Sequence, residues 1–194
     1  MKVFVACEFS QTVCIEFRKR GHEAFSCDLL PCEGGHPEWH IQDDCLRHLN
    51  DGWDLMIAHP PCTYFAVAGL QYLKTKPGRL NKQKKSAEFI KNLWNADINK
   101  ICLENPIGQL PKYIGEYSQI IRMWQFGYPE ANKPTCLWLK NLPLLKPSNV
   151  VSPIKSRKYP NGKVLSQWRA KTSGSKNRSI TFKNVAKAMA EQWG

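Results

Sequence analysis

The stretches Asp54-Leu-Met-Ile-Ala-His-Pro-Pro-Cys62 and Ile101-Cys-Leu-Glu-Asn-Pro106 decide the fold. Each begins as a short apolar run typical of a buried strand and stops at a rigid polar end. The first ends with a thiol after a Pro-Pro turn, and the second ends with a carboxylate beside Asn105. In a parallel sheet the carboxyl ends of neighbouring strands face one crevice, where ligands bind. A thiol and a carboxylate that meet there are suited to covalent attack on a ring whose polar edge the carboxylate holds.

The segments around these two stretches alternate between strand and helix. Further strands are predicted at Val3–Ala6, Glu23–Cys27 and Cys136–Leu139. Helices are predicted at Thr12–Arg20, Ser86–Ala96 and Ile180–Trp193, and Ser86 is the predicted N-cap of the second. This order predicts an α/β fold of the Rossmann-like, doubly wound type, with a mostly parallel sheet.

Three regions follow from composition along the chain. Residues 1–140 carry the strand and helix signals and form the predicted Rossmann-like catalytic domain. Residues 141–179 are rich in Pro, Gly, Ser and Lys and have little periodicity, so a small, irregular, basic lobe is expected there. Residues 180–194 form an amphipathic helix expected to pack back on the domain.

The net charge of +12 is concentrated in the last third of the chain. Residues 131–194 hold 13 Lys and Arg against one acid, whereas residues 1–130 hold 15 of each sign. A neutral body with a cationic flank suits a polyanion such as DNA or RNA, although a solubilising surface is the alternative. The candidate phosphate contacts are Lys133, Arg157, Lys158, Arg169, Lys171, Lys176 and Arg178.

A second basic stretch, Lys74–Lys85, has six basic residues and no acid. It is predicted to be either a loop that closes over nucleic acid or a solvated linker.

The cysteines and the N-terminus indicate a cytoplasmic protein without a membrane span. Eight cysteines are spread through strand-like and helix-like segments, as reduced buried thiols usually are. No apolar run approaches the ~20 residues of a membrane-spanning helix, and the first segment becomes polar at Glu8, too early for a signal peptide. A zinc site could in principle be built from Cys27, Cys32, His36, His40 and Cys45, but the spacing fits no strong pattern, so no metal is predicted.

Acidic residues at two other strand ends suggest a nucleoside-containing ligand. Asp28 follows a predicted strand about 20 residues after the first strand-to-helix turn, where such folds place an acid for ribose hydroxyls. Asp43 and Asp44 lie at a third candidate strand end, where a carboxylate can accept from an adenine amino group. A plain cap or turn role is the alternative for each of these acids.

The order of these parts resembles the C5-cytosine DNA methyltransferases, and most closely the short phage-encoded members. Pro61-Cys62 resembles the catalytic Pro-Cys motif, and Glu104-Asn105-Pro106 resembles the Glu-Asn-Val motif. The segment Phe65–Gly69 resembles the continuation of the first motif, Phe126–Glu130 the approach to the Gln-Arg-Arg motif, and Arg178–Met189 the final motif.

The resemblance implies methylation of cytosine C5 in DNA with S-adenosylmethionine as the methyl donor, in a bacterial host cell if the chain is phage-encoded. Cys62 would add to C6, and Glu104 would hold the N3/N4 edge of the base. The cofactor contacts would be Phe9, Ser10, Asp28, Asp44 and Pro60. Cys62 would need a lowered pKa, supplied by a following helix N-terminus or a nearby cation. His59 is expected to be a turn histidine or to tune Cys62.

The chain departs from the family pattern in three places. The cofactor turn, Ala6–Thr12, has no glycine, and the Gln-Arg-Arg positions read Glu130-Ala-Asn-Lys-Pro134. Only residues 141–179 are available for target recognition, so specificity should be short, weak or supplied by a protein partner. Two alternatives therefore stay open: an enzyme that modifies a free pyrimidine nucleotide, and a nucleic-acid-binding protein on a catalytically decayed methyltransferase fold, such as a counter-defence factor.

Overall fold

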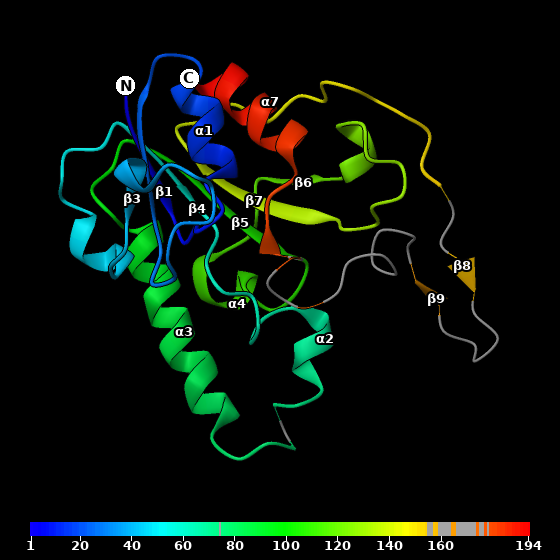
Figure 1. Ribbon diagram of the computed structural model, residues 1–194. Coiled ribbons are helices and arrows are strands. Elements are labelled where there is room, and N and C mark those ends of the chain that lie inside the picture. Colours follow the sequence, from blue (N-terminus) through cyan, green and yellow to red (C-terminus); the bar gives the residue numbers. More distant parts are fainter. Residues whose placement is uncertain (74, 155–156, 159–163, 166–173, 175–176, 178) are drawn as a thin grey trace.

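A seven-stranded sheet in the order β3-β2-β1-β4-β5-β7-β6 forms the centre of the protein (Figure 1). The computed structural model describes residues 1–73, 75–154, 157–158, 164–165, 174, 177 and 179–194. The strands are β1 (Lys2–Ala6), β2 (Glu23–Cys27), β3 (His40–Ile41), β4 (Leu55–Ala58), β5 (Lys100–Pro106), β6 (Gln119–Ile121) and β7 (Thr135–Lys140). Strands β1 to β5 are mutually parallel, and β7 runs antiparallel to both β5 and β6. The predicted Rossmann-like, mostly parallel α/β fold is therefore confirmed.

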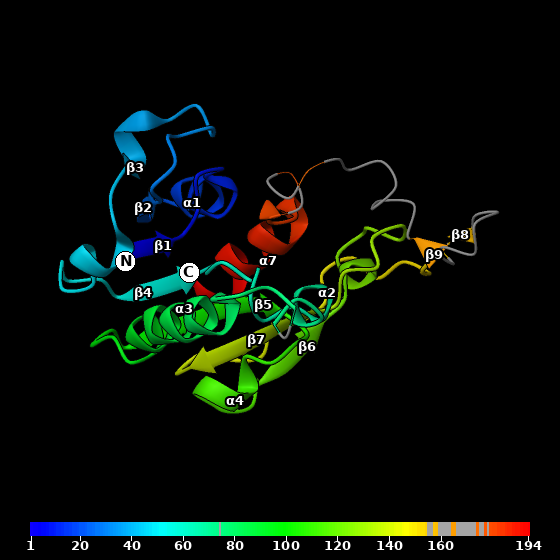
Figure 2. The same cartoon turned by 90° about the horizontal axis from the view of Figure 1, so that it is seen from below.

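Helices cover both faces of this sheet. Helices α1 (Thr12–Arg18) and α7 (Lys183–Trp193) lie side by side on one face, and α3 (Arg79–Trp94) covers the other (Figures 1 and 2). The shorter helices are α2 (Val67–Leu70), α4 (Pro111–Ile114), η1 (Pro37–Trp39), η2 (Cys45–His48) and η3 (Met123–Gln125). Strands β8 (Arg157–Lys158) and β9 (Val164–Leu165) form a separate antiparallel hairpin.

Alternation along the central strands builds two cores. Val3 and Val5 belong to the core under α1 and α7, which includes Met189. Phe4 belongs to the core under α3, with Ile90. Because both faces are covered, β1 is apolar without interruption from Val3 to Ala6, as expected for an inner parallel strand.

The chain order across the sheet reverses between β1 and β4, which creates the crevice where ligands bind in such folds. The His59 amide donates to the Ala6 carbonyl at 2.9 Å, so the end of β4 lies directly beside the end of β1. On the other side Ala58 pairs with Leu103. Glu104 therefore stands just beyond the last paired residue of β4.

Helix α3 begins at Arg79, and the predicted start with Ser86 as N-cap is wrong. Gly78, with φ of 71°, precedes the first turn. Residues 79–85 are polar except for the exposed Leu80 and are mostly good helix formers, and Gln83 is buried in phase with Ala87 and Ile90. The prediction that Lys74–Lys85 is a loop or linker is therefore wrong from Arg79 onward.

The predicted lobe begins with a segment held against the sheet. Leu145 lies in the core under α1 and α7, and its backbone N–H and C=O bond the Gln119 side chain, both at 2.8 Å. Gln192 of α7 also bonds both backbone groups of Lys146. Most of residues 155–178 lies outside the described part of the chain, so the domain division stays a prediction. Among the described residues, no helix combines the length and apolar character needed to cross a membrane.

Candidate active site

A cavity of about 290 Å³ opens at the carboxyl ends of β4 and β5. Cys62 and Glu104, the two predicted catalytic residues, both line it. Pro60 and Lys133, predicted to contact the cofactor and DNA respectively, line the same cavity, as does His59. The structure thus brings four of the predicted site residues together from three segments far apart in the sequence.

Glu104 is a buried carboxylate at the centre of this site. Its Oε2 atom lies 2.9 Å from Nδ1 of His59, and the two side chains are only 12% and 7% exposed. Burial raises the pKa of Glu104, but Lys133 and hydrogen bonds from His59 and Thr135 outweigh it and hold the pKa below the usual 4.5. Glu104 is therefore ionised at neutral pH and can only accept hydrogen bonds.

The loop that carries Cys62 is fixed by hydrogen bonds to its backbone. The Cys62 carbonyl accepts from the amides of Phe65 and Ala66, both at 3.0 Å. The next three carbonyls accept in turn from Arg79 at 3.0 Å, Gln83 at 2.7 Å and the Gln109 amide at 2.9 Å. Such immobilisation presents the thiol in one position.

Asn105 holds the start of the same loop. Its side-chain amide donates to the Pro60 carbonyl at 2.9 Å, and the residue is 1% exposed. Glu104 and Asn105 both line the cavity, and Asn105 also fastens the loop that carries the thiol.

The expectation that Cys62 has a lowered pKa is wrong for this state of the protein. Desolvation, followed by the charge of Glu104, raises the pKa of the Cys62 thiol, and Lys133 only partly offsets them. Lys133 is the nearby cation that was expected, but its charge also stabilises the ionised Glu104. Helix α2 starts five residues after Cys62 and has only four residues, so its dipole gives little help.

The turn between β1 and α1 is tight although it has no glycine. Cys7 and Gln11 adopt left-handed backbone conformations, with φ of 60° and 56°. Glycine usually occupies such positions because it has no Cβ. Glu8 caps α1 by accepting from the amides of Val13 at 2.7 Å and Cys14 at 3.2 Å. The backbone path expected of a glycine-rich turn is thus reached with other residues.

A second, smaller cavity of about 30 Å³ lies against this turn. Phe9 and Ser10, both predicted cofactor contacts, line it together with Glu8. His59 lines this cavity as well as the larger one. The two cavities are therefore neighbours, and His59 and Ser179 line both of them.

Asp28 stands at the end of β2, as predicted. Its amide donates to Ile41 of β3 at 3.2 Å, and its Oδ1 accepts from the Leu30 amide at 2.9 Å. Burial is the main cause that raises the pKa of this carboxyl.

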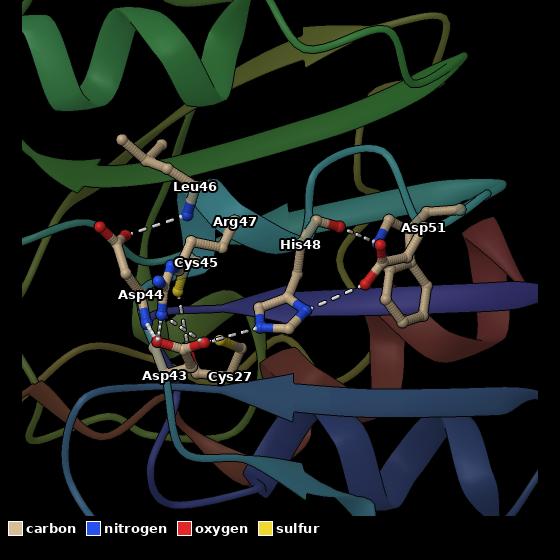
Figure 3. A network of polar contacts seen from close by, with 9 residues as sticks. Cys27, Asp43, Asp44, Cys45, Leu46, Arg47, His48 and Asp51 are labelled. Atoms are coloured by element: carbon tan, nitrogen blue, oxygen red, sulfur yellow. Dashed lines mark hydrogen bonds and ion pairs between the residues drawn. The ribbon is translucent and has the colours of Figure 1, made fainter.

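Asp44 caps η2, since its Oδ1 accepts from the Leu46 amide at 3.0 Å (Figure 3). Its neighbour Asp43 is held by Arg47 at 3.2 Å and by His48 at 3.3 Å. This network orders the strand end that is predicted to face an adenine amino group.

Three thiols connect these strand ends. The Cys7 amide donates to Sγ of Cys45 at 3.3 Å, and Cys45 donates to the Cys27 carbonyl at 3.4 Å. All three are free cysteines. Of the other residues considered for zinc, His36 stacks on Trp39 and His40 bonds Ser26. No group of three or more metal-binding side chains is found within the described residues.

The predicted DNA contacts separate into three groups. Lys133 lies inside the larger cavity, with its Nζ 6.0 Å from the ring centre of Phe182. Arg157 and Lys158 form β8. Arg169, Lys171, Lys176 and Arg178 lie outside the described residues.

Sequence reasoning missed the residues that support the site from a distance. Arg79 and Gln83 of α3 hold the Cys62 loop, and Gln11 fixes the loop before η1 through His36 and Cys32. Only Gln83 could have been recognised from the sequence, because it continues the helical spacing of the buried residues of α3. The His59–Glu104 bond joins residues 45 positions apart, and it follows only from the strand register.

Comparison with known proteins gives a likeness in fold. No protein-family model matches the chain, and no curated protein matches it by sequence. A solved E. coli structure, described as a candidate DNA modification methyltransferase encoded within a prophage, matches 78% of this chain and 52% of its own. The TM-score is 0.50 and the sequence identity is 12%. The chain thus spans about half the length of that protein, and the match agrees with the Rossmann-like architecture described above.

Proposed function

We propose that this chain is an S-adenosylmethionine-dependent methyltransferase that modifies C5 of cytosine in DNA through a covalent bond to Cys62. The observation that carries the proposal is one cavity that holds the Cys62 thiol and the ionised Glu104 at adjoining strand ends. Its volume of about 290 Å³ is near the lower end of usual ligand sites, which suits one flat ring.

Glu104 has the acceptor character that a cytosine edge needs. As a carboxylate it accepts from the exocyclic N4 amine and from N3 when the ring is protonated there. Protonation at N3 withdraws electrons from C6 and prepares it for attack. The bound base also shields the Glu104 charge, so a cause of the raised Cys62 pKa weakens when the substrate arrives.

Cys62 then acts as the nucleophile. Its thiolate forms the S–C6 bond while the C5–C6 π electrons move to C5, which becomes enamine-like. S-adenosylmethionine, when bound, supplies the methyl group. A base takes the proton from C5, the π bond forms again, and the S–C6 bond breaks to return the thiolate.

The residues at the crevice fit this cofactor. The left-handed backbone at Cys7 and Gln11 makes the tight turn against which a methionine moiety can lie. Phe9, Ser10 and Pro60 line the two neighbouring cavities, and Asp28 stands where a ribose would need an acceptor. Asp44 is the predicted partner of the adenine.

DNA is the proposed substrate because the positive charge of the last third exceeds what one nucleotide needs. A duplex base must leave its stack to reach Cys62, at a cost of about a few kcal/mol. The similarity in fold to a candidate DNA modification methyltransferase supports the same class of substrate.

The test is covalent trapping on DNA that contains 5-fluorocytosine. Fluorine at C5 cannot leave as a proton does, so the enzyme should remain bound to the DNA when cofactor is present. Peptide mapping should place the adduct on Cys62, and Cys62→Ser should form none while it binds DNA nearly as the wild type does. A trapped species in Cys62→Ser, or an adduct on another cysteine, would refute the mechanism.

A further inference from the structure

His59 connects the two cavities of the site. It is the first residue after β4, and its amide bonds Ala6 at the end of β1. Its side chain lines the larger cavity with Cys62 and the smaller one with Ser10. A ligand that extends from the β1 turn toward Cys62 must pass this imidazole.

The bond to Glu104 fixes which nitrogen of His59 carries hydrogen. Glu104 is ionised and can only accept, so the hydrogen of the 2.9 Å contact belongs to Nδ1. Nε2 is then a bare acceptor when the ring is neutral. It is buried and has no hydrogen-bond partner among the residues that the structure describes. A buried, unpaired polar atom is costly, which indicates that something other than the described side chains satisfies it.

The charged groups around His59 come from several elements. Glu104 of β5 lies on its Nδ1 side, and Lys133, which precedes β7, interacts with Glu104. Glu8 of the β1–α1 turn lines the smaller cavity together with His59. Cys62 and Cys7 are the titratable thiols of the two cavities.

We propose that His59 presents its Nε2 lone pair to the positively charged sulfonium of the methyl donor, so that the site prefers the charged donor to its neutral product. This inference rests on the proposed function. The donor and its demethylated product differ at the sulfur, which is a cation in S-adenosylmethionine and an uncharged sulfide in S-adenosylhomocysteine. An acceptor beside the sulfur favours only the first.

The experiment measures the ratio of the two affinities by calorimetric titration without DNA. Asparagine is the informative substitution, because its amide can still donate to Glu104 as Nδ1 does but places no acceptor at Nε2. His59→Asn should lower the preference for S-adenosylmethionine by at least about fivefold, mainly by weakening its binding. His22→Asn, on the surface at the other end of β1, is the matched control and should keep the wild-type ratio.

An unchanged ratio of the two affinities in His59→Asn would overturn the inference while leaving the proposed function standing. Failure of the wild type to bind either ligand would instead overturn the proposed function, and the role of His59 with it.

Discussion

The reactivity of Cys62 depends on two charges of opposite sign in the same cavity. Desolvation is the main cause that raises the pKa of the thiol, and the charge of Glu104 is the second. Lys133 lowers this pKa. Lys133 also lowers the pKa of Glu104. The three groups are therefore electrostatically coupled. Removal of the Glu104 charge should lower the pKa of the Cys62 thiol, and removal of the Lys133 charge should raise it.

Glu104→Gln should make Cys62 more reactive toward iodoacetamide at neutral pH. The substitution removes the negative charge that raises the thiol pKa, and below the pKa a fall of one unit gives about tenfold more thiolate. An increase of about three- to tenfold in the alkylation rate is expected, with the rate–pH profile displaced to lower pH. Mass spectrometry of the Cys62 peptide measures both.

Lys133→Met is the counterpart of that variant, because it keeps an unbranched stem and removes the positive charge. Its Cys62 alkylation should be slower than in the wild type, and its profile should move to higher pH. Equal rates in all three proteins would show that the two charges do not control this thiol.

The meeting of Cys62 and Glu104 in one cavity was predictable because each follows an apolar run that is typical of an inner strand. Parallel strands bring such ends to one edge whatever the details of packing. The pKa of Cys62 was not predictable, because it depends on how near Glu104 and Lys133 lie. Lys133 was expected at phosphates, yet the chain before β7 turns it into the cavity.

At the level of elements, α3 acts as a support for the Cys62 loop. Gln83 is buried in this helix, donates to the Tyr64 carbonyl at 2.7 Å and accepts from the Tyr113 hydroxyl at 3.1 Å. Arg79, one turn earlier, donates to Thr63 and lies over the Tyr64 ring. The polar first half of α3 therefore bonds the loop directly, whereas its second half packs in the core.

Gln83→Ala should destabilise the protein by about 1–3 kcal/mol, because it leaves the Tyr64 carbonyl and the Tyr113 hydroxyl without this partner in partly buried positions. Chemical denaturation measures the loss, and methyl transfer should fall with it because the loop is no longer held. Lys84→Ala changes the exposed neighbour on the same helix and should stay within about 0.5 kcal/mol of the wild type. Equal stabilities of the two variants would contradict the supporting role of Gln83.

The segment after β5 supports the loop from the other side. A Cβ atom on Gly108 would lie 2.0 Å from the Phe65 carbonyl oxygen, and neither backbone can move easily. Gly108→Ala should therefore break the bond from the Gln109 amide to Phe65 and cost about 1–3 kcal/mol. Ile107→Ala, at an exposed neighbouring position, should have little effect on the same unfolding transition. Retention of full stability in Gly108→Ala would show that the two segments are not in close contact in solution.

The start of α3 shows where periodicity fails as a guide to elements. An apolar stripe indicates only the part of a helix that faces a core, so it begins at Ala87. The turns before it face a loop whose backbone carbonyls need donors, and there Arg79 and Gln83 replace apolar residues. Strand β5 is similar, because Glu104 and Asn105 continue the ladder with β7 beyond the apolar run. In both elements the part missed by the pattern is the part that supports the site.

For the molecule as a whole, charge is separated along the chain. The neutral first two thirds form six of the seven strands of the sheet. The basic last third supplies β7 and continues into β8 and β9 before α7 returns to the core beside α1. The central strands of the body were predictable because they are apolar runs, whereas the short strand β6 was not predicted. The path of residues 155–178 was not predictable either, since a polar segment rich in Lys, Arg and Ser has no pattern from which to derive one.

This separation predicts that DNA binding by the basic region obeys counterion release. Each phosphate contact contributes about 0.9 to the slope of log affinity against log salt for duplex DNA, so the double variant Arg157→Gln/Lys158→Gln should lower that slope by roughly 2. The matched control is Lys91→Gln/Lys187→Gln, which removes the same charge from exposed positions on α3 and α7. Fluorescence anisotropy at several salt concentrations gives both slopes. If the slope falls by the same amount in both variants, net charge alone attracts the DNA. If the slope falls only in the β8 variant, the phosphate contacts belong to the basic last third.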